Sequence, residues 1–140
     1  MHPEVLAFIT QNPVCTLATC DGDQPHVRGF LSNIIDGKLY FTSSTAKAVG
    51  RQLHANAKVE LCYLSQDFMK MLRIRAVMKK VDDRQIKQQL IDTRDYLAHF
   101  SADDPTFMLL VPVNGEAWFW TLADNLNEAD VPRVPFQAEA

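Results

Sequence analysis

The chain lacks the motifs that identify several common enzyme classes. It has no glycine-rich dinucleotide fingerprint, no G-x-x-x-x-G-K-[ST] loop and no serine elbow, so nucleotide hydrolysis and acyl transfer have no support. Its three cysteines, Cys15, Cys20 and Cys62, show no C-x-x-C spacing and leave at least one unpaired. The sequence therefore indicates neither a disulfide framework nor a zinc site, and we expect the cysteines to be buried side chains on strands.

The sequence also has no excess of positive charge and no long apolar run. Its formal net charge is −3, so the overall balance does not attract the protein to nucleic acid or to an anionic membrane. No window approaches the roughly 20 apolar residues of a membrane span, and no basic segment precedes an apolar run at the start. We expect a soluble, cytoplasmic protein whose cationic side chains act locally.

With 140 residues and 47% hydrophobic composition, the chain suits one compact domain. Hydrophobic periodicity predicts helices over residues 4–9, 46–55 and 84–97. Strands are predicted over residues 14–19, 25–34, 38–42, 58–64, 69–81, 106–113 and 116–121, with turns at Asp21-Gly22-Asp23, Asp36-Gly37 and Asn114-Gly115. We expect the first three strands to form a meander, residues 1–122 to form the domain, and residues 123–140 to form a frayed tail.

These elements predict a mainly β fold with short helices. Six or so antiparallel strands with short helices between them point to a small closed or partly closed β-barrel, because closure removes exposed sheet edges. No internal repeat or low-complexity segment is present.

A run of four hydroxyl side chains, Thr42, Ser43, Ser44 and Thr45, ends the third strand and is followed by Lys47 in the first turn of the next helix. Short donors, free backbone N–H groups and one positive charge together form a suitable cradle for a phosphate. An alternative is that the hydroxyls cap the helix and that Lys47 is an ordinary solvated lysine.

Arg28 stands in the middle of the second strand, next to Val27 and close to Phe30. An unpaired buried cation is costly, so this side chain needs a partner. Either it binds an anion, or it lies on an exposed face in a surface ion pair worth about 0–1 kcal/mol.

The order of these elements resembles the FMN-binding split barrel of the pyridoxamine 5′-phosphate oxidase family over about residues 3–121. The similarity rests on a leading helix before Asn12-Pro13, a strand with a central arginine, the segment Leu39-Tyr40-Phe41-Thr42-Ser43, a helix beginning near a lysine, and the stretch His54-Ala55-Asn56-Ala57-Lys58. The resemblance implies a six- to seven-stranded antiparallel split barrel that binds FMN in a groove between two identical subunits.

The resemblance also implies roles for particular residues. Arg28 and Lys47 would contact the flavin phosphate, together with the hydroxyl loop. The second strand would lie along the flavin ring, and an aromatic residue of the last strand would pack near it. The implied cofactor-binding residues are Arg28, Gly29, Phe30, Leu31, Ser32, Asn33, Phe41, Thr42, Ser43, Ser44, Thr45, Lys47, Met71 and Trp118.

The chain departs from the oxidase at three positions. The oxidase carries a lysine at the position of Asn33, an Arg-Lys pair at Ala46-Lys47, and a glutamine at the position aligned with Met71. The resemblance therefore implies a substrate other than pyridoxamine phosphate, and it is nearest to the short general-stress or nitroimidazole-resistance-like branch.

Together these features predict a homodimeric FMN-binding oxidoreductase that acts on a small molecule. No catalytic residue is indicated: His26 is a candidate proton donor, with an ordinary strand-edge histidine as the alternative. Arg73 and Arg75 would serve dimer contacts or an anionic substrate equally well. A deazaflavin-dependent or nitro-compound reductase and a non-catalytic flavin- or haem-binding protein remain as alternatives.

Overall fold

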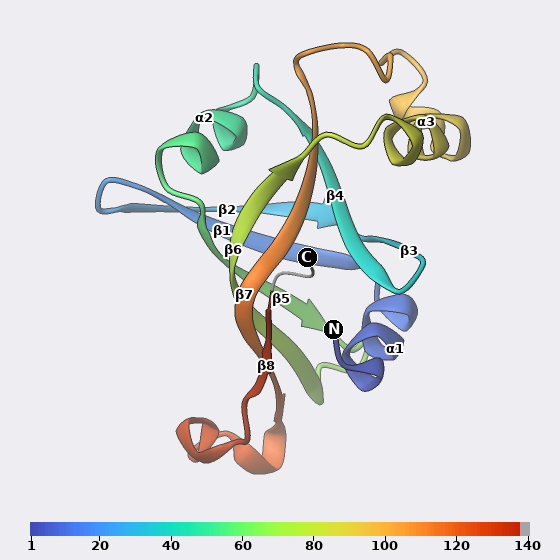
Figure 1. The fold of residues 1–140 in the computed structure, drawn as a ribbon. Coiled ribbons are helices and arrows are strands. Elements are labelled where there is room, and N and C mark those ends of the chain that lie inside the picture. The colour runs from blue at the N-terminus through green and yellow to red at the C-terminus, as the bar shows by residue number, and fades with distance from the viewer. Residues whose placement is uncertain (138–140) are drawn as a thin grey trace.

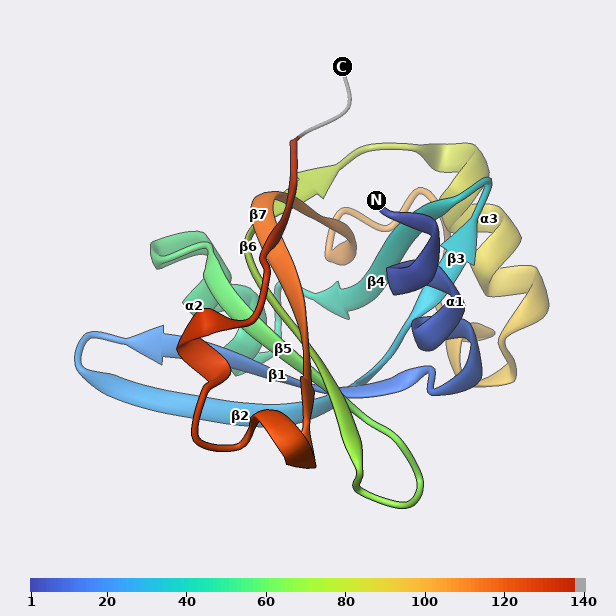
Figure 2. The same cartoon turned by 90° about the horizontal axis from the view of Figure 1, so that it is seen from below.

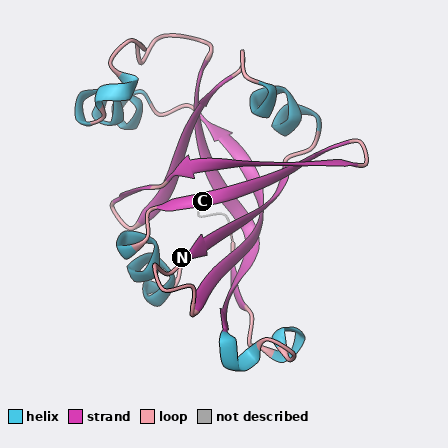
Figure 3. Ribbon diagram, turned by 180° about the vertical axis from the view of Figure 1, so that it is seen from behind, coloured by secondary structure: helices cyan, strands magenta, loops and turns pink. Residues whose placement is uncertain are grey.

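The protein folds as a strongly curled antiparallel sheet with helices around its rim (Figures 1 and 3). The computed structural model describes residues 1–137. The helices are α1 (Pro3–Gln11), α2 (Ala48–Ala55) and α3 (Arg84–Thr93). The strands are β1 (Val14–Asp21), β2 (Gln24–Leu31), β3 (Asn33–Ile35), β4 (Lys38–Ser44), β5 (Lys58–Leu64), β6 (Lys70–Val81), β7 (Phe107–Thr121) and β8 (Val134–Phe136).

Seven strands follow one another in the order β2-β1-β5-β6-β7-β4-β3, and β8 pairs with β7 beside this path. This curled half-barrel confirms the prediction of a six- to seven-stranded antiparallel split barrel. Ser32 separates β2 from β3, so the predicted strand 25–34 is broken and its two parts lie at opposite ends of the sheet. The predicted meander of the first three strands is therefore wrong. The turns at Gly22 and Gly37 do close the β1–β2 and β3–β4 pairs, and both glycines have positive φ.

The interior of the barrel is filled by alternating side chains of the strands. On β1, for example, Cys15, Leu17 and Thr19 are buried, while the residues between them are more exposed. The helix α1 adds Val5 and Ile9 to this core, and it ends before Pro13 because proline disfavours helical backbone in the residue that precedes it. Cys20 is exposed and Cys62 half-buried, so the expectation of buried cysteines holds only for Cys15.

The helices α2 and α3 lie at the same end of the sheet (Figure 1). Asp83 caps the N-terminus of α3, and its carboxylate accepts a hydrogen bond from the Ile86 N–H at 3.0 Å. It packs on a second apolar cluster that includes Tyr40, Leu90 and Phe107. Within the described chain, no helix is both long and apolar enough to cross a membrane.

The strand β7 is continuous, so the predicted hairpin at Asn114-Gly115 is wrong. Asn114 has a φ of 50°, and the β6–β7 register shifts between Arg75 and Val77, opposite this point. A Cβ atom at Gly115 would overlap the Arg75 carbonyl oxygen. The Asn-Gly pair therefore bends one strand through a bulge and does not reverse the chain.

The predicted frayed tail is also wrong for the part of residues 123–140 that the structure describes. Two short 3₁₀ turns, at Leu122–Asp124 and Glu128–Asp130, lead into β8, which runs back along β7 (Figure 2). Residues 138–140 lie outside the described part of the chain.

Candidate functional site

The hydroxyl run lies where β4 ends and the chain turns into α2. Ser43 is only 5% exposed, and its hydroxyl has no hydrogen-bond partner among residues 1–137. The Ser44 hydroxyl accepts a hydrogen bond from the Ala46 N–H at 3.1 Å, which tightens the turn before the helix. The Thr45 N–H donates to the Thr106 carbonyl at 2.9 Å, and this holds the loop against β7. The loop is thus fixed while Ser43 and Thr45 keep hydrogen-bonding capacity.

The N-terminus of α2 has no side-chain cap. Lys47 is the N-cap residue with extended backbone, so it stands just before the first turn and not in it as predicted. The first intrahelical bond runs from the Arg51 N–H to the Lys47 carbonyl, which leaves the N–H groups of Ala48, Val49 and Gly50 without an acceptor inside the helix. Because Ser44 bonds Ala46 instead of these groups, the alternative of a hydroxyl cap is wrong. Exposed Lys47 and the helix dipole make this position attractive to an anion.

Gly50 holds α2 close to the hydroxyl run. A Cβ atom there would overlap the Ser44 carbonyl oxygen and lie 3.0 Å from the Thr45 Cα. Only a glycine allows the helix to approach the loop this closely. The position of the helix N-terminus relative to Ser44 and Thr45 therefore depends on Gly50.

Arg28 reaches the same helix from the inner face of β2. Its guanidinium donates to the Thr19 hydroxyl at 2.7 Å and to the Gln52 side-chain oxygen at 2.5 Å, and Thr19 itself donates to Gln52 at 2.6 Å. Burial lowers the pKa of the Arg28 guanidinium. Within the described chain Arg28 makes no ion pair, so the alternative of a surface ion pair is wrong. Two neutral partners leave its positive charge uncompensated and at least three of its five N–H donors free for an anion.

The strand residues after Arg28 approach β4 across the interior of the barrel. Gly29 is exposed and Leu31 half-buried, while the Phe30 ring meets the Phe41 ring edge-on at 5.9 Å. Ser32 is buried and shares a 2.7 Å hydrogen bond with the Tyr63 hydroxyl.

Two further residues predicted to contact the flavin are Asn33 and Thr42. Asn33 accepts a 3.0 Å hydrogen bond from Arg94, and Thr42 is half-buried. With Ser32 and Asn33 both engaged, this segment can offer a ligand its backbone more readily than its side chains.

Met71 and Trp118 lie away from this group. The register partners across the sheet link the two positions. Gly29 on β2 pairs with Thr16 on β1, Thr16 pairs with Cys62 on β5, and Cys62 pairs with Arg73 on β6, which pairs with Trp118 on β7. Four strand spacings of about 4.8 Å separate Gly29 from Trp118, or about 19 Å along the sheet. Met71 lies on β6, three strands from β2. Along the sheet, Trp118 and Met71 are therefore four and three strands away from the strand that carries Arg28.

The C-terminal segment covers Trp118, which is 2% exposed. The Glu128 carboxylate accepts from the indole N–H at 2.9 Å and from Arg73 at 2.8 Å, and these bonds lower the pKa of Glu128. Arg133 stacks 4.2 Å from the ring. Sequence reasoning missed Glu128 because its partners Arg73 and Trp118 lie on strands outside its own segment.

The arginines on β6 pair within the chain. Arg73 also contacts Glu60, and Arg75 lies 3.7 Å from Glu60 and 3.6 Å from Glu116. Their charge is thus compensated by carboxylates on neighbouring strands and the C-terminal segment. This makes them weaker candidates than Arg28 for binding an anionic substrate.

Two buried groups inside the barrel, Cys15 and Tyr63, stay protonated near neutral pH. Burial raises the pKa of the Cys15 thiol to about 11, and burial also raises the pKa of Tyr63. His26 is half-buried on β2 opposite Thr19. Within residues 1–137, no three His, Cys, Asp or Glu side chains are grouped so that they could hold a metal ion.

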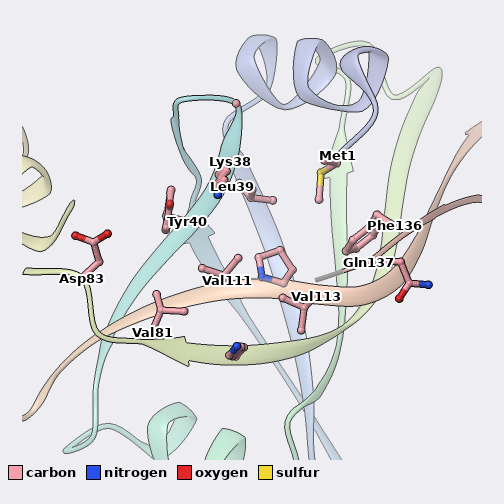
Figure 4. A pocket seen from close by; sticks show the side chains of 13 residues that line it. Met1, Lys38, Leu39, Tyr40, Val81, Asp83, Val111, Val113, Phe136 and Gln137 are labelled. Carbon is pink, nitrogen blue, oxygen red and sulfur yellow. The ribbon is translucent and has the colours of Figure 1, made fainter. Parts of the chain in front are cut away.

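A pocket that the sequence did not indicate lies where the sheet is split (Figure 4). The ladder between β4 and β7 covers Phe41–Ser44 on β4 and ends at Leu110 on β7. Pro112 lies two residues further along β7 and cannot donate a backbone hydrogen bond. The lining is Met1, Gly37, Lys38, Leu39, Tyr40, Lys79, Val81, Asp83, Val111, Pro112, Val113, Phe136 and Gln137. These residues come from five separate stretches of the chain, so no local pattern could have identified the pocket.

A family model described as pyridoxamine 5′-phosphate oxidase matches residues 1–120. Among solved structures, a NimC/NimA family protein of Clostridium acetobutylicum is similar with 27% identity and a TM-score of 0.78, covering 95% of this chain and 91% of that one. General Stress Protein 26 of Bacillus anthracis has 14% identity and a TM-score of 0.73, covering 95% of this chain and 96% of its own. No curated protein matches the chain.

Two more distant structures share the fold and carry different cofactor names. One is an FAD-binding protein of Mesorhizobium loti, with 18% identity and a TM-score of 0.60 over 84% of this chain and 94% of that one. The other is HutZ, the heme storage protein of Vibrio cholerae, with 22% identity and a TM-score of 0.61 over 86% of this chain and 93% of that one. At these identities the similarity shows the fold alone.

Proposed function

The chain belongs to the pyridoxamine 5′-phosphate oxidase family, and from this premise we propose that it is an FMN-binding oxidoreductase of the NimC/NimA and general stress protein 26 branch that acts on a small molecule. Family members typically bind flavin. The observation that carries the proposal is the uncapped N-terminus of α2, with Lys47 before it and the hydroxyl run against it.

The residues at this position suit the phosphate of FMN. The side chain of Lys47 supplies a mobile positive charge, and the free N–H groups of the first turn point toward the same end of the helix. Thr45 adds a hydroxyl, and the buried hydroxyl of Ser43 has no partner among the described residues. Arg28 contributes a second, uncompensated charge on the Gln52 side of the helix. Phosphate binding would satisfy donors that the folded chain leaves unused.

We propose that the flavin ring lies along β2, next to the backbone of residues 29–33 and near Phe41 and Thr42. Aromatic packing between Phe30 and Phe41 keeps β2 and β4 at a fixed separation there. When bound, flavin supplies two-electron redox chemistry, while the protein orients it and sets its electrostatic surroundings. This division of labour agrees with the raised pKa values of Cys15 and Tyr63, which leave these two buried groups protonated near neutral pH.

We further propose that two copies of the chain form the complete site. Met71 lies on β6, three strands from β2 along the sheet, so we propose that it reaches the flavin bound to the partner subunit, whereas Trp118 is covered by its own C-terminal segment. The outer face of β1 and β2 exposes Val14 and Val27, which are 65% and 66% exposed. Apolar strand faces of this kind favour packing against a second copy.

The substrate is proposed to be a small molecule other than pyridoxamine phosphate. Where the oxidase has a lysine, this chain has Asn33, which is 3% exposed and bound to Arg94. A buried amide in this position cannot provide the positive charge that a phosphorylated substrate needs. We therefore propose that the protein shares the cofactor of the oxidase but catalyses a different reaction.

The visible absorption spectrum of the purified protein separates flavin from haem. We expect bands near about 370 and 450 nm, which are typical of flavin, and a species in light scattering of twice the 15.9 kDa chain. A haem spectrum would favour the binding function suggested by the fold of HutZ. A colourless protein that takes up no added FMN would contradict the proposed cofactor.

A further inference from the structure

We propose a second binding site, for a monovalent organic acid with an apolar body, on the flank of α2 that faces away from Arg28. A pocket there, called the α2 flank pocket below, lies between the helix and the ends of β6 and β7. Its lining is Thr45, Gly50, Arg51, Leu53, His54, Met78, Lys80, Met108 and Leu110.

The floor of the α2 flank pocket is apolar. Leu53, Met78, Met108 and Leu110 are all less than 7% exposed and belong to the main core. Two of them are methionines, whose unbranched side chains adapt to ligands of different shape. The floor is therefore suited to the hydrocarbon part of a ligand and offers it no hydrogen bond.

The rim is basic and contains no carboxylate. Arg51, His54 and Lys80 are exposed at the rim, and the lining includes no Asp or Glu. Arg51 donates one hydrogen bond to the Ala46 carbonyl at 2.9 Å, which fixes the guanidinium and leaves its other donors available. The side chain of Lys80 has no hydrogen-bond or ion-pair partner within residues 1–137.

The combination of floor and rim selects the class of ligand. In a chain with net charge −3, a lining with two permanent cations and no anion attracts negative charge locally. An apolar floor of a few side chains accommodates a short chain or a single ring. Aromatic acids and medium-chain fatty acids share this chemistry.

The pocket is distinct from the proposed cofactor position. Gln52, which binds Arg28, and His54, which lines the pocket, are two residues apart on α2 and so point to different sides of the helix. Lys47 and Arg28 do not line the pocket, and Thr45 stands at the boundary between the two. The inference rests on the fold and the pocket, and it does not require bound flavin.

Calorimetric titration of the protein as purified tests this site with 4-phenylbutyrate and its uncharged analogue 4-phenylbutanamide. We expect the acid to bind at least about tenfold more tightly than the amide. Lys80→Gln and Arg51→Gln should each weaken the binding of the acid by about tenfold. Octanoate as a third probe distinguishes a fatty-acid site from one that prefers a ring. The FMN affinity of Lys80→Gln should stay unchanged, which separates this test from that of the cofactor.

Lys79→Gln is the matched control. Lys79 is the next residue on β6, with the same charge, but it lines the pocket at the split on the other face of the sheet. Equal affinity for acid and amide, no binding of any probe, or an equal loss in Lys79→Gln and Lys80→Gln would each overturn the proposal.

Discussion

Alanine in place of Arg28 or Lys47 should weaken FMN binding by about 1–3 kcal/mol for each substitution, the range of a lost charge-assisted hydrogen bond. Lys47 stands at the uncapped N-terminus of α2, where a phosphate would meet free N–H groups and the positive end of the helix dipole. Arg28 has only the neutral partners Thr19 and Gln52, so its charge is available to the phosphate that we propose there. With both removed, we expect affinity to fall by more than about thirtyfold.

Fluorescence titration of flavin-free protein with FMN measures this effect, because bound flavin changes its emission. The Thr19–Gln52 hydrogen bond does not involve Arg28, so the fold should survive the substitution. Lys58→Ala is the control: Lys58 is an exposed lysine at the start of the strand after α2. Unchanged affinity in both variants, or an equal loss in Lys58→Ala, would show that the phosphate is not held here.

Alanine in place of Gly50 should destabilise the protein by about 2 kcal/mol, within the range that overpacking costs. Helix propensity alone predicts the opposite sign, since alanine is favoured over glycine by about 1 kcal/mol inside a helix. The new methyl group would overlap the Ser44 carbonyl oxygen and push α2 away from the hydroxyl run. The same displacement should reduce FMN affinity, because the helix N-terminus and the loop would no longer converge.

Denaturant unfolding of Gly50→Ala gives the free energy directly. Gly29→Ala serves as the control, because a Cβ atom at Gly29 meets nothing closer than the Cys15 carbonyl at 4.0 Å. We expect that control to stay within about 1 kcal/mol of the wild-type stability. A stabilised Gly50→Ala protein would mean that the close approach of α2 to Ser44 has no structural role.

Local patterns predicted most of the secondary structure. Alternation placed β5 over its observed residues, and helical periodicity correctly placed the start of α3 at Arg84. The order of the strands was harder, because chain neighbours were assumed to be sheet neighbours. Ser32 breaks the second strand, and the two halves pair at opposite ends of the path.

The Asn-Gly pair shows why a strong local signal can fail. Asn114 adopts the positive φ that a hairpin turn requires, yet β6 is long enough to pair with both halves of β7. Eleven residue pairs along this ladder outweigh the preference of a two-residue turn. Long-range pairing of this kind is not visible within a window of ten residues.

Part of the candidate site was visible in the sequence and part was not. The run from Thr42 to Lys47 is contiguous, so its polar character was evident. Gln52, which connects Arg28 to α2, looked like an ordinary helix residue, because its role depends on a contact across 24 positions of the chain. Glu128 was missed for the same reason, since its partners Arg73 and Trp118 are supplied by other strands.

The most direct test of the account compares FMN with riboflavin in calorimetric titrations of the flavin-free protein. The two ligands share the ring and the ribityl chain and differ in the phosphate that we assign to Lys47, Arg28 and the hydroxyl run. The account predicts FMN binding at least about a hundredfold tighter than riboflavin, equivalent to about 2.7 kcal/mol. Equal affinities, or no binding of either ligand, would contradict it.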